Sequence, residues 1–205
     1  MPDFARPLHE QDVDPDPLRQ FAAWFTDVQK AGVREPTAMV VATASADAVP
    51  SARMVLLKCY DERGFVFFTN YASRKGLELT DNPHAALLFY WDAVGRQVRI
   101  EGRVQRTSTE ETAAYVRSRP RGSQLSALAS PQSLTVASRD DLEELVAQLA
   151  ARYDDGELPL PETWGGFRVS PQRFEFWQHR EDRLHDRLLY TPDDEGGWRI
   201  DRLAP

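Results

Sequence analysis

Three short apolar segments follow one another so closely that they limit the folds open to this chain. They cover residues 37–44, 51–60 and 64–70, and only a few residues separate each from the next. Short apolar runs rich in β-branched residues are typical of β-strands. Antiparallel neighbours need only a tight turn between them, whereas parallel neighbours need a crossover of a dozen or more residues. We therefore expect these segments to be antiparallel strands.

Two further strands are expected at residues 84–91 and 96–106. In the second, polar residues such as Gln97 and Arg99 alternate with apolar ones such as Val98, so that one face is polar. Residues 165–203 also alternate like strands, with turns at "HRED" and "DDEGG". The chain is therefore expected to be mainly β.

Helices are expected at residues 16–32, 73–83, 108–119 and 138–153. Asp16 can cap the first helix, and Ser108 with Glu111 has the spacing of a capping box. There is no repeat and no linker long enough to divide the chain. The pattern predicts a mainly β (α+β) protein, in which antiparallel strands form a barrel or strongly bent sheet with peripheral helices. We expect one domain, 1–205, with a flexible segment at residues 1–15.

Composition limits the ligands that such a protein can bind. Hydrophobic residues make up 41% of the 205 residues, which is enough for one substantial core. The formal net charge of −7 argues against a nucleic-acid partner. Any site for an anionic ligand must therefore be a local concentration of cations.

Cysteine content and the chain's apolar runs bear on its environment. Cys59 is the only cysteine, so no internal disulfide is possible, and we expect it in the core. No Cys and His cluster has zinc spacing, so no metal site is expected. The sequence has no signal-peptide pattern and no apolar run near the roughly 20 residues that span a bilayer. These features favour a cytoplasmic protein without a membrane partner.

Arg53 and Lys58 lie in the otherwise apolar strand segment "SARMVLLK". Cations there are costly unless they are paired or bind an anion. Because they are five residues apart, a regular strand would place them on opposite faces. A bulge, or two different ligands, would be needed for both to serve one site. Salt bridges at the strand ends are the alternative explanation.

Arg74 and Lys75 lie at the expected N-terminus of a helix. Free N–H groups and the helix dipole already favour an anion at such a place, where basic residues do not stabilise the helix itself. A phosphate site is therefore one interpretation, and a solvated loop is the other.

Tyr115 and Arg119 are four residues apart on one expected helix face, so their side chains can converge, and Ser123 follows the helix end. Two hydroxyls and a guanidinium suit a phosphate monoester. An ordinary surface stack of tyrosine on arginine is the alternative.

The segment "EFWQHREDRLHDR", residues 175–187, concentrates positive charge. Arg183, His185 and Arg187 fall at every second position, which would put all three on one face of a β-strand. Trp177 lies in the same segment, and an indole is costly to leave in water. A solvated strand face balanced by acidic residues is the alternative.

Together these motifs resemble the pyridoxine (pyridoxamine) 5′-phosphate oxidase family. The resemblance runs from about residue 16 to the end, through "RMVLLK", "FTNYASRKG", "NPHAALLFYW", "RQVRIEG", "YVRSRPRGSQ", "PQS", "WGGFRV" and "FEFWQHREDRLHDR". The family is a split β-barrel homodimer with FMN at the subunit interface. The resemblance therefore implies an FMN-binding split β-barrel, FMN as cofactor and a second copy of the chain as partner.

The resemblance also implies residue roles. The implied FMN-binding residues are Arg53, Met54, Val55, Leu56, Leu57, Lys58, Phe68, Thr69, Arg74, Lys75, Gln97, Gln132, Ser133, Trp177 and Arg187. The implied substrate-binding residues are Lys58, Tyr115, Arg119, Ser123, Arg183, Leu184 and His185. The implied catalytic residues are Arg183, His185 and Arg187, and we do not expect His185 to be an obligatory base.

The implied reaction is FMN-dependent oxidation of pyridoxamine 5′-phosphate and pyridoxine 5′-phosphate to pyridoxal 5′-phosphate, with dioxygen as acceptor and hydrogen peroxide as product. FMN and substrate each bring a phosphate with a charge near −2, and the sequence supplies two basic groups for them. The chain departs from the family at Ser126 and Leu128, where Gly and Trp are usual. It also lacks the family's N-terminal segment containing Arg and Tyr.

Two other functions remain open. Related flavoproteins of phenazine biosynthesis share the C-terminal signature, but their tricyclic substrates carry no phosphate. Such proteins would not need Lys58, Tyr115, Arg119 and Ser123 together, and this chain keeps all four. A split-barrel module that holds FMN or haem as a sensor or store would not need Arg183 and His185.

Overall fold

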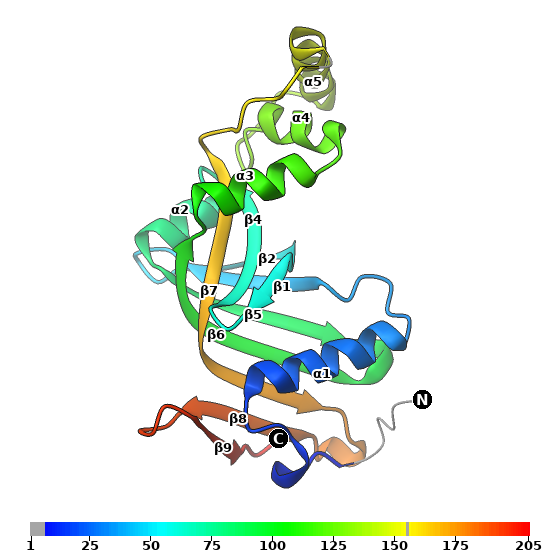
Figure 1. Ribbon diagram of the computed structural model, residues 1–205, viewed down its shortest axis with the longest axis vertical. Helices are drawn as coiled ribbons and strands as arrows, with labels where there is room; N and C mark the ends of the chain where they lie inside the picture. The colour runs from blue at the N-terminus through cyan, green and yellow to red at the C-terminus, as the bar shows by residue number, and fades with distance from the viewer. Residues whose placement is uncertain (1–6, 155) are drawn as a thin grey trace.

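The structure, a computed structural model, describes residues 7–154 and 156–205. Within them, nine strands form one sheet in the order β2-β1-β5-β6-β7-β4-β3, and β8 and β9 extend from β7 (Figure 1). All the strand pairs are antiparallel. The strands are β1 (Ala38–Ala44), β2 (Pro50–Leu56), β3 (Cys59–Asp61), β4 (Gly64–Asn70), β5 (His84–Trp91), β6 (Arg96–Arg106), β7 (Trp164–Gln178), β8 (Asp186–Pro192) and β9 (Trp198–Arg202).

Strand β7 sets the shape of the sheet because its two ends have different partners. Residues 164–169 pair with β4 and residues 174–178 pair with β8, while β6 accompanies both. The register between β6 and β7 shifts at Glu101/Gly102, a bulge of the kind that bends a strand. A Cβ at Gly102 would lie 2.0 Å from the carbonyl oxygen of Ser170, so this close approach requires glycine. The sheet therefore curls into a half-barrel.

Helix α1 (Pro17–Lys30) covers the apolar face of the sheet (Figure 1). The side chain of Asp16 caps it by accepting a hydrogen bond of 2.8 Å from the N–H of Leu18. Phe21 is fully buried, and its ring meets those of Phe65 and Phe89 at centroid distances of 4.9 and 5.2 Å. This aromatic cluster fixes the helix against β4 and β5.

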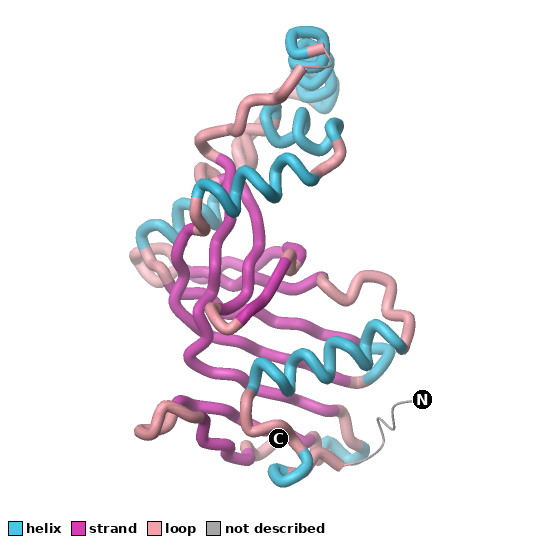
Figure 2. The backbone as a smooth tube through the Cα atoms, in the orientation of Figure 1, coloured by secondary structure: helices cyan, strands magenta, loops and turns pink. Residues whose placement is uncertain are grey.

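The other helices lie at the periphery of the strands, as Figure 2 shows. They are α2 (Arg74–Asp81), α3 (Thr109–Ser118), α4 (Arg121–Ala129) and α5 (Arg139–Tyr153), with short 3-10 turns η1 (Glu10–Asp12), η2 (Asp92–Val94) and η3 (Glu181–Arg183). Helices α3, α4 and α5 follow one another beyond the end of the sheet where β7 begins (Figure 1). No helix in the described residues is both long and apolar enough to cross a membrane.

The predicted fold class is confirmed, and so are the four predicted helices. Helix α4 was not predicted, because Pro120 at its N-cap position makes no side-chain capping bond and it buries only Leu125 and Ala129. Its sequence therefore carries neither a capping signal nor an apolar stripe.

Two expectations about individual positions need revision. Cys59 is exposed and not in the core, because β2 has already ended and Leu57 occupies the core position. Of the segment that we expected to be flexible, residues 1–6 lie outside the described residues. Farther along that segment, Leu8 and Val13 are buried in the core cluster.

Candidate active site

Arg53 and Lys58 line the same pocket although they are five positions apart in the sequence. Strand β2 ends at Leu56 and β3 begins only at Cys59, so Lys58 lies in the break between them and the chain is not one regular strand. At this break the side chain of Leu57 enters the core, and its N–H donates to the carbonyl oxygen of Thr37. We expected that a bulge would be needed to bring Arg53 and Lys58 to one site, and the break between the strands has that effect.

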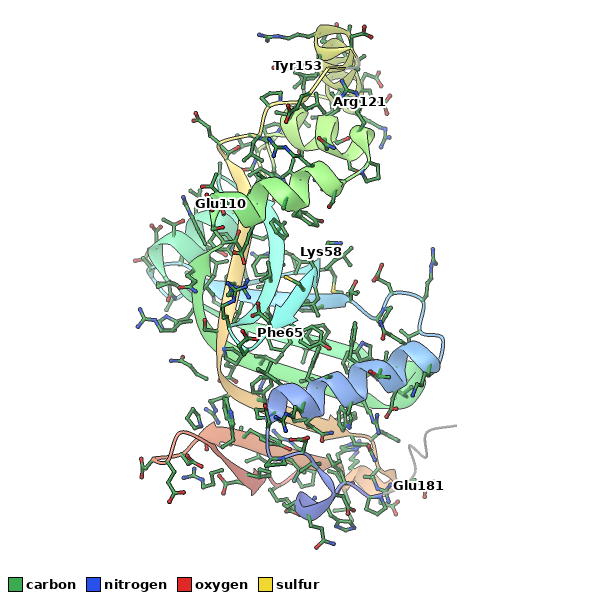
Figure 3. The ribbon with its side chains drawn as sticks, in the orientation of Figure 1. Lys58, Phe65, Glu110, Arg121, Tyr153 and Glu181 are labelled. Carbon is green, nitrogen blue, oxygen red and sulfur yellow. The ribbon has the colours of Figure 1, made fainter. Side chains whose placement is uncertain are left out.

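The pocket has a volume of about 420 Å³ and is formed by β2, β4, the start of β7 and the helices α2, α3 and α4. In Figure 3, Lys58 lies on the side of the sheet toward these helices. The residues with a predicted role that line it are Arg53, Met54, Val55, Leu56, Lys58, Phe68, Thr69, Lys75, Tyr115, Arg119, Ser123 and Gln132. The structure thus gathers one large subset of the predicted residues, drawn from segments far apart in the sequence.

Five further residues line the pocket, and none of them was predicted to bind a ligand. They are Asn70, Ser126, Ala127, Ser130 and Trp164. A detectable signal existed for Trp164, because an aromatic residue stands directly before two glycines in "WGGFRV". Ser126, one of the two departures from the family pattern, lines the pocket, whereas Leu128 does not.

Lys75 supplies a buried positive charge to the pocket, with 8% of the residue exposed. Its Nζ donates to Thr69 Oγ1 at 2.9 Å, to Gln132 Oε1 at 3.0 Å and to Ser73 Oγ at 3.3 Å, all of them neutral oxygens. Burial, together with nearby Arg53, lowers the pKa of Lys75 to about 8. An ammonium group held only by neutral oxygens is stabilised when an anion binds beside it.

Glu78 holds two arginines at the same end of the site. Its Oε2 accepts from Arg53 Nη2 at 3.3 Å and its Oε1 accepts from Arg74 Nε at 2.9 Å. Burial alone would raise the pKa of Glu78, but hydrogen bonds from Ser51, Thr43 and Arg74 hold that pKa at about 2. Glu78 is therefore a permanent carboxylate that orients both guanidinium groups.

Helix α3 brings Tyr115 and Arg119 to the pocket. The Tyr115 ring stacks on that of Phe68, with centroids 3.8 Å apart, and burial raises the pKa of its hydroxyl, which remains a hydrogen-bond donor. The guanidinium of Arg119 lies over the ring of Trp164, 4.7 Å from the centroid. Its Nη1 is buried and has no hydrogen-bond partner among the described residues. A buried donor without a partner is costly and suits an anionic ligand.

A second group of predicted residues lies on the other half of the sheet. Gln97, Trp177 and Arg187 are direct neighbours in register on β6, β7 and β8, so they share one face. Arg187 Nε donates to Glu175 Oε1 at 2.8 Å, and Arg99 Nη2 donates to the other oxygen of this buried carboxylate at 2.6 Å. Glu175 therefore fixes the direction of Arg187.

Arg183 and His185 precede β8 and do not share its strand face, contrary to the expectation from their spacing. Arg183 ends the turn η3, and both it and Asp182 have a positive φ, of 61° and 56°. The His185 ring lies 4.7 Å from that of Trp177, and its Nδ1 accepts a hydrogen bond of 3.1 Å from the N–H of Arg180. Leu184 between them is largely exposed. The loop thus places these residues beside Trp177 by a turn and not by strand alternation.

The two groups lie at opposite ends of β7. Trp164 begins this strand and Trp177 is close to its end, which is roughly 40 Å of extended chain at about 3.3 Å per residue. In Figure 3, Lys58 and Glu181 lie in different parts of the molecule. One chain therefore carries the predicted site residues as two separate groups.

Three predicted FMN residues belong to neither group. The side chain of Leu57 is in the core, and Arg74 and Ser133 line an adjoining pocket of about 340 Å³ together with Glu78. Over the described residues, no group of three or more His, Cys, Asp or Glu side chains could hold a metal ion.

The curled antiparallel sheet and its cationic pocket define a split-barrel protein with a site for anionic ligands. Residues 25–163 match the family described as Pyridoxamine 5′-phosphate oxidase. Residues 164–205 match the Pyridoxine 5′-phosphate oxidase C-terminal dimerisation region. The chain belongs to the pyridoxamine 5′-phosphate oxidase family.

Individual relatives agree with this assignment. The chain is 57% identical over 198 residues to a Pyridoxine/pyridoxamine 5′-phosphate oxidase of Rubrobacter xylanophilus, which covers 97% of this chain and 91% of the relative. It is 56% identical over 200 residues to the protein of that name from Burkholderia vietnamiensis, covering 97% and 93%. A solved structure of PhzG from Burkholderia lata, in complex with tetrahydrophenazine-1-carboxylic acid, is 33% identical with a TM-score of 0.91 and covers 98% of this chain and 99% of that one.

Proposed function

We propose that this chain, an oxidoreductase, uses FMN to oxidise pyridoxamine 5′-phosphate and pyridoxine 5′-phosphate to pyridoxal 5′-phosphate, with dioxygen as acceptor and hydrogen peroxide as product. The observation that carries the proposal is that one pocket holds two separate cationic sets. Arg53 and Lys75 come from β2 and α2, and Arg119 comes from the end of α3. Two phosphates, each near −2, match these two sets.

For FMN, we assign the phosphate to Arg53, Arg74 and Lys75. The neutral oxygens around Lys75 and the alignment of both arginines by Glu78 support this assignment. Each charge-assisted hydrogen bond contributes about 1.5–3 kcal/mol, part of which is lost to desolvation and ordering. The other residues that would contact FMN are Met54, Val55, Leu56, Leu57, Lys58, Phe68, Thr69, Gln97, Gln132, Ser133, Trp177 and Arg187.

For the substrate, we assign the phosphate to Lys58, Tyr115, Arg119 and Ser123. All four line the pocket, and the buried Arg119 Nη1 without a partner supports a ligand at this place. We assign the pyridine ring to the Arg183, Leu184 and His185 loop, because this exposed turn lies beside Trp177.

Bound FMN would supply the acceptor for the hydride that leaves the substrate carbon bearing the alcohol or amine. The protein's part is position and electrostatics. Arg187, directed by Glu175, provides positive charge that stabilises negative charge on a reduced ring. Because His185 Nδ1 accepts the Arg180 N–H, neutral His185 carries its proton on Nε2. We therefore assign it as a donor that orients the substrate and not as an obligatory base.

A second copy of the chain would complete the site. Within one chain the pocket and the Arg183 loop lie at different ends of β7, and the matched dimerisation region spans β7, β8 and β9. Met54 on β2 and Tyr90 on β5 leave 61% and 57% of their surfaces exposed, and a second copy of the chain could cover them. We propose a homodimer of single-domain subunits, 1–205, with FMN at the interface.

Oxygen consumption with pyridoxamine 5′-phosphate tests the function. We expect pyridoxal 5′-phosphate and hydrogen peroxide to form in equal amounts, and denaturation to release about one FMN per subunit. Pyridoxine without phosphate is the control and should be a poor substrate. A protein that holds FMN but consumes no oxygen would indicate a flavin store. Turnover of phosphate-free tricyclic compounds alone would indicate the phenazine-type activity.

A further inference from the structure

Trp164 lines the pocket but has no part in the function proposed above. It is the first residue of β7, where it pairs with Asn70 of β4, and its N–H donates to the carbonyl oxygen of Pro161 at 3.0 Å. Its ring is parallel to that of Tyr115 within 2° at a centroid distance of 5.9 Å, and to that of Phe68 within 16° at 6.0 Å. The sheet and two aromatic rings therefore fix the plane of the indole.

Arg119 rests on this indole. The guanidinium carbon lies 4.7 Å from the ring centroid, within the range of a cation–π contact. Arg119 is also the C-cap of α3, where the backbone is already extended at φ −79° and ψ 148°, so the helix itself does not direct its side chain. None of the ion pairs between described residues includes Arg119. The contact with Trp164 is thus the main restraint that the structure provides on the guanidinium.

The two kinds of restraint in the pocket have different consequences for ligand binding. Arg53 is held by the carboxylate of Glu78, which cancels part of its charge. An indole holds a guanidinium by its face and leaves the charge and the N–H edge free. The buried Arg119 Nη1 without a partner is part of that free edge.

We propose that Trp164 is a positioning residue that holds Arg119 flat, with its N–H edge preorganised for the phosphate of the substrate. The proposal rests on the proposed function of the pocket and deepens it, because it makes Trp164 a determinant of preference for phosphorylated over non-phosphorylated substrates. Preorganisation removes the cost of ordering the arginine when the phosphate binds. Pyridoxal, which has no phosphate, gains nothing from it.

Equilibrium dialysis of the flavin-loaded protein with pyridoxal 5′-phosphate and with pyridoxal measures this preference directly. Trp164→Leu removes the ring but keeps an apolar side chain, and we expect it to weaken pyridoxal 5′-phosphate binding about tenfold while pyridoxal binding stays unchanged. Trp164→Phe keeps a smaller ring and should recover most of the loss. In turnover, KM for pyridoxamine 5′-phosphate should rise in Trp164→Leu while kcat changes little.

Trp198→Leu is the matched control, because it removes an indole on β9 that packs edge-on against Phe174 and does not line the pocket. It should change neither affinity. Three results for Trp164→Leu overturn the proposal: equally weaker binding of both ligands, loss of FMN, or unchanged binding of pyridoxal 5′-phosphate. The proposal is also overturned if the parent protein binds pyridoxal 5′-phosphate and pyridoxal equally well. A parent that prefers the phosphorylated ligand but consumes no oxygen refutes the oxidase function instead, and the dialysis still decides the role of Trp164.

Discussion

Arg119 illustrates how one side chain can separate the two phosphate assignments. It lines the pocket beside Tyr115 and Trp164, whereas the side chains that bond to Lys75 are Thr69, Ser73 and Gln132. A change at Arg119 should therefore affect the substrate's phosphate and leave that of FMN bound.

We expect Arg119→Ala to reduce kcat/KM for pyridoxamine 5′-phosphate by roughly 2–4 kcal/mol of transition-state stabilisation, mostly as a raised KM, because a guanidinium is removed from a partly desolvated dianion site. FMN content should be unchanged. Arg117→Ala is the control, since Arg117 is exposed on the same helix and, among the described residues, forms its ion pair with the exposed Glu157. Loss of FMN in Arg119→Ala would show that the residues are wrongly divided between the phosphate of FMN and that of the substrate.

Lys75 gives the site a predictable dependence on pH. Its pKa is lowered from 10.5 to about 8, chiefly by burial, and a bound phosphate must raise it because the anion favours the ammonium form. FMN should therefore bind best below pH 8, where Lys75 is already protonated. Above that pH, we expect the Kd of FMN to rise by up to about tenfold per pH unit, as measured by fluorescence titration of the apoprotein.

The matched variants for this test are Lys75→Met and Lys30→Met. Lys75→Met should bind FMN more weakly, and its affinity should no longer fall between pH 8 and pH 9. Lys30 is exposed at the end of α1, so its replacement should leave both the affinity and its pH dependence intact. If the affinity of Lys75→Met for FMN falls as steeply between pH 8 and pH 9 as that of the parent protein, a group other than Lys75 causes the pH dependence.

At the scale of elements, α3 and α5 begin alike but are attached differently. Each starts at a serine whose side chain accepts a hydrogen bond of 3.1 Å, Ser108 from the N–H of Glu111 and Ser138 from that of Asp141. Glu111 also accepts 2.9 Å from Arg168 of β7, and α3 buries Thr112 and Val116, whereas none of the residues of α5 is buried. The start of α3 is therefore fixed to the sheet that carries the pocket.

We expect Ser108→Ala to lower the free energy of unfolding by about 1 kcal/mol, measured by denaturant titration, because a capping bond of a packed helix is lost. Ser138→Ala removes an equivalent bond but should change global stability much less, because α5 can unfold locally before the rest of the molecule. Equal losses in the two variants would mean that α5 is packed in solution, for example by a second copy of the chain.

For the whole molecule, the decisive feature is that the predicted site residues form two separate groups along β7, which are two half-sites in the proposed dimer. Arg119→Ala alters the half-site around the pocket, and Arg183→Ala alters the other half-site. A homodimer of either variant should therefore have low activity at low substrate concentration. If each site combines halves from two chains, a mixed dimer contains one site with both residues intact. Random mixing should then restore about a quarter of the parental activity.

Co-expression or refolding of mixtures provides this measurement, and each variant mixed with itself is the control. Activity that stays at the level of the two separate variants would show that Arg119 and Arg183 act within one chain. In that case the site would have to close by a rearrangement of β7, and the proposed interface site would be wrong.

Local signals explain why so much of the fold could be predicted. The strands were marked by apolar, β-branched runs, and α1 and α3 by capping residues that the structure confirms, Asp16 and the Ser108–Glu111 box. Helix α4 has no such signals, and it was missed. Cys59 was misplaced because its burial depends on where β2 ends, which no local pattern reveals.

Local sequence patterns are sufficient to predict the residue types that this protein can use in chemistry, the order of most of its strands and helices, and the motifs that identify its family. These follow from local spacing and capping, which act over a few residues. Which of these residues come together depends on the folded chain and could not be predicted from such patterns. The break between β2 and β3 brings Lys58 to the side of Arg53, η3 takes Arg183 off the strand face, and β7 separates the two groups of predicted site residues. Such outcomes depend on strand pairing between distant segments, and pairing is selected by packing of the whole core.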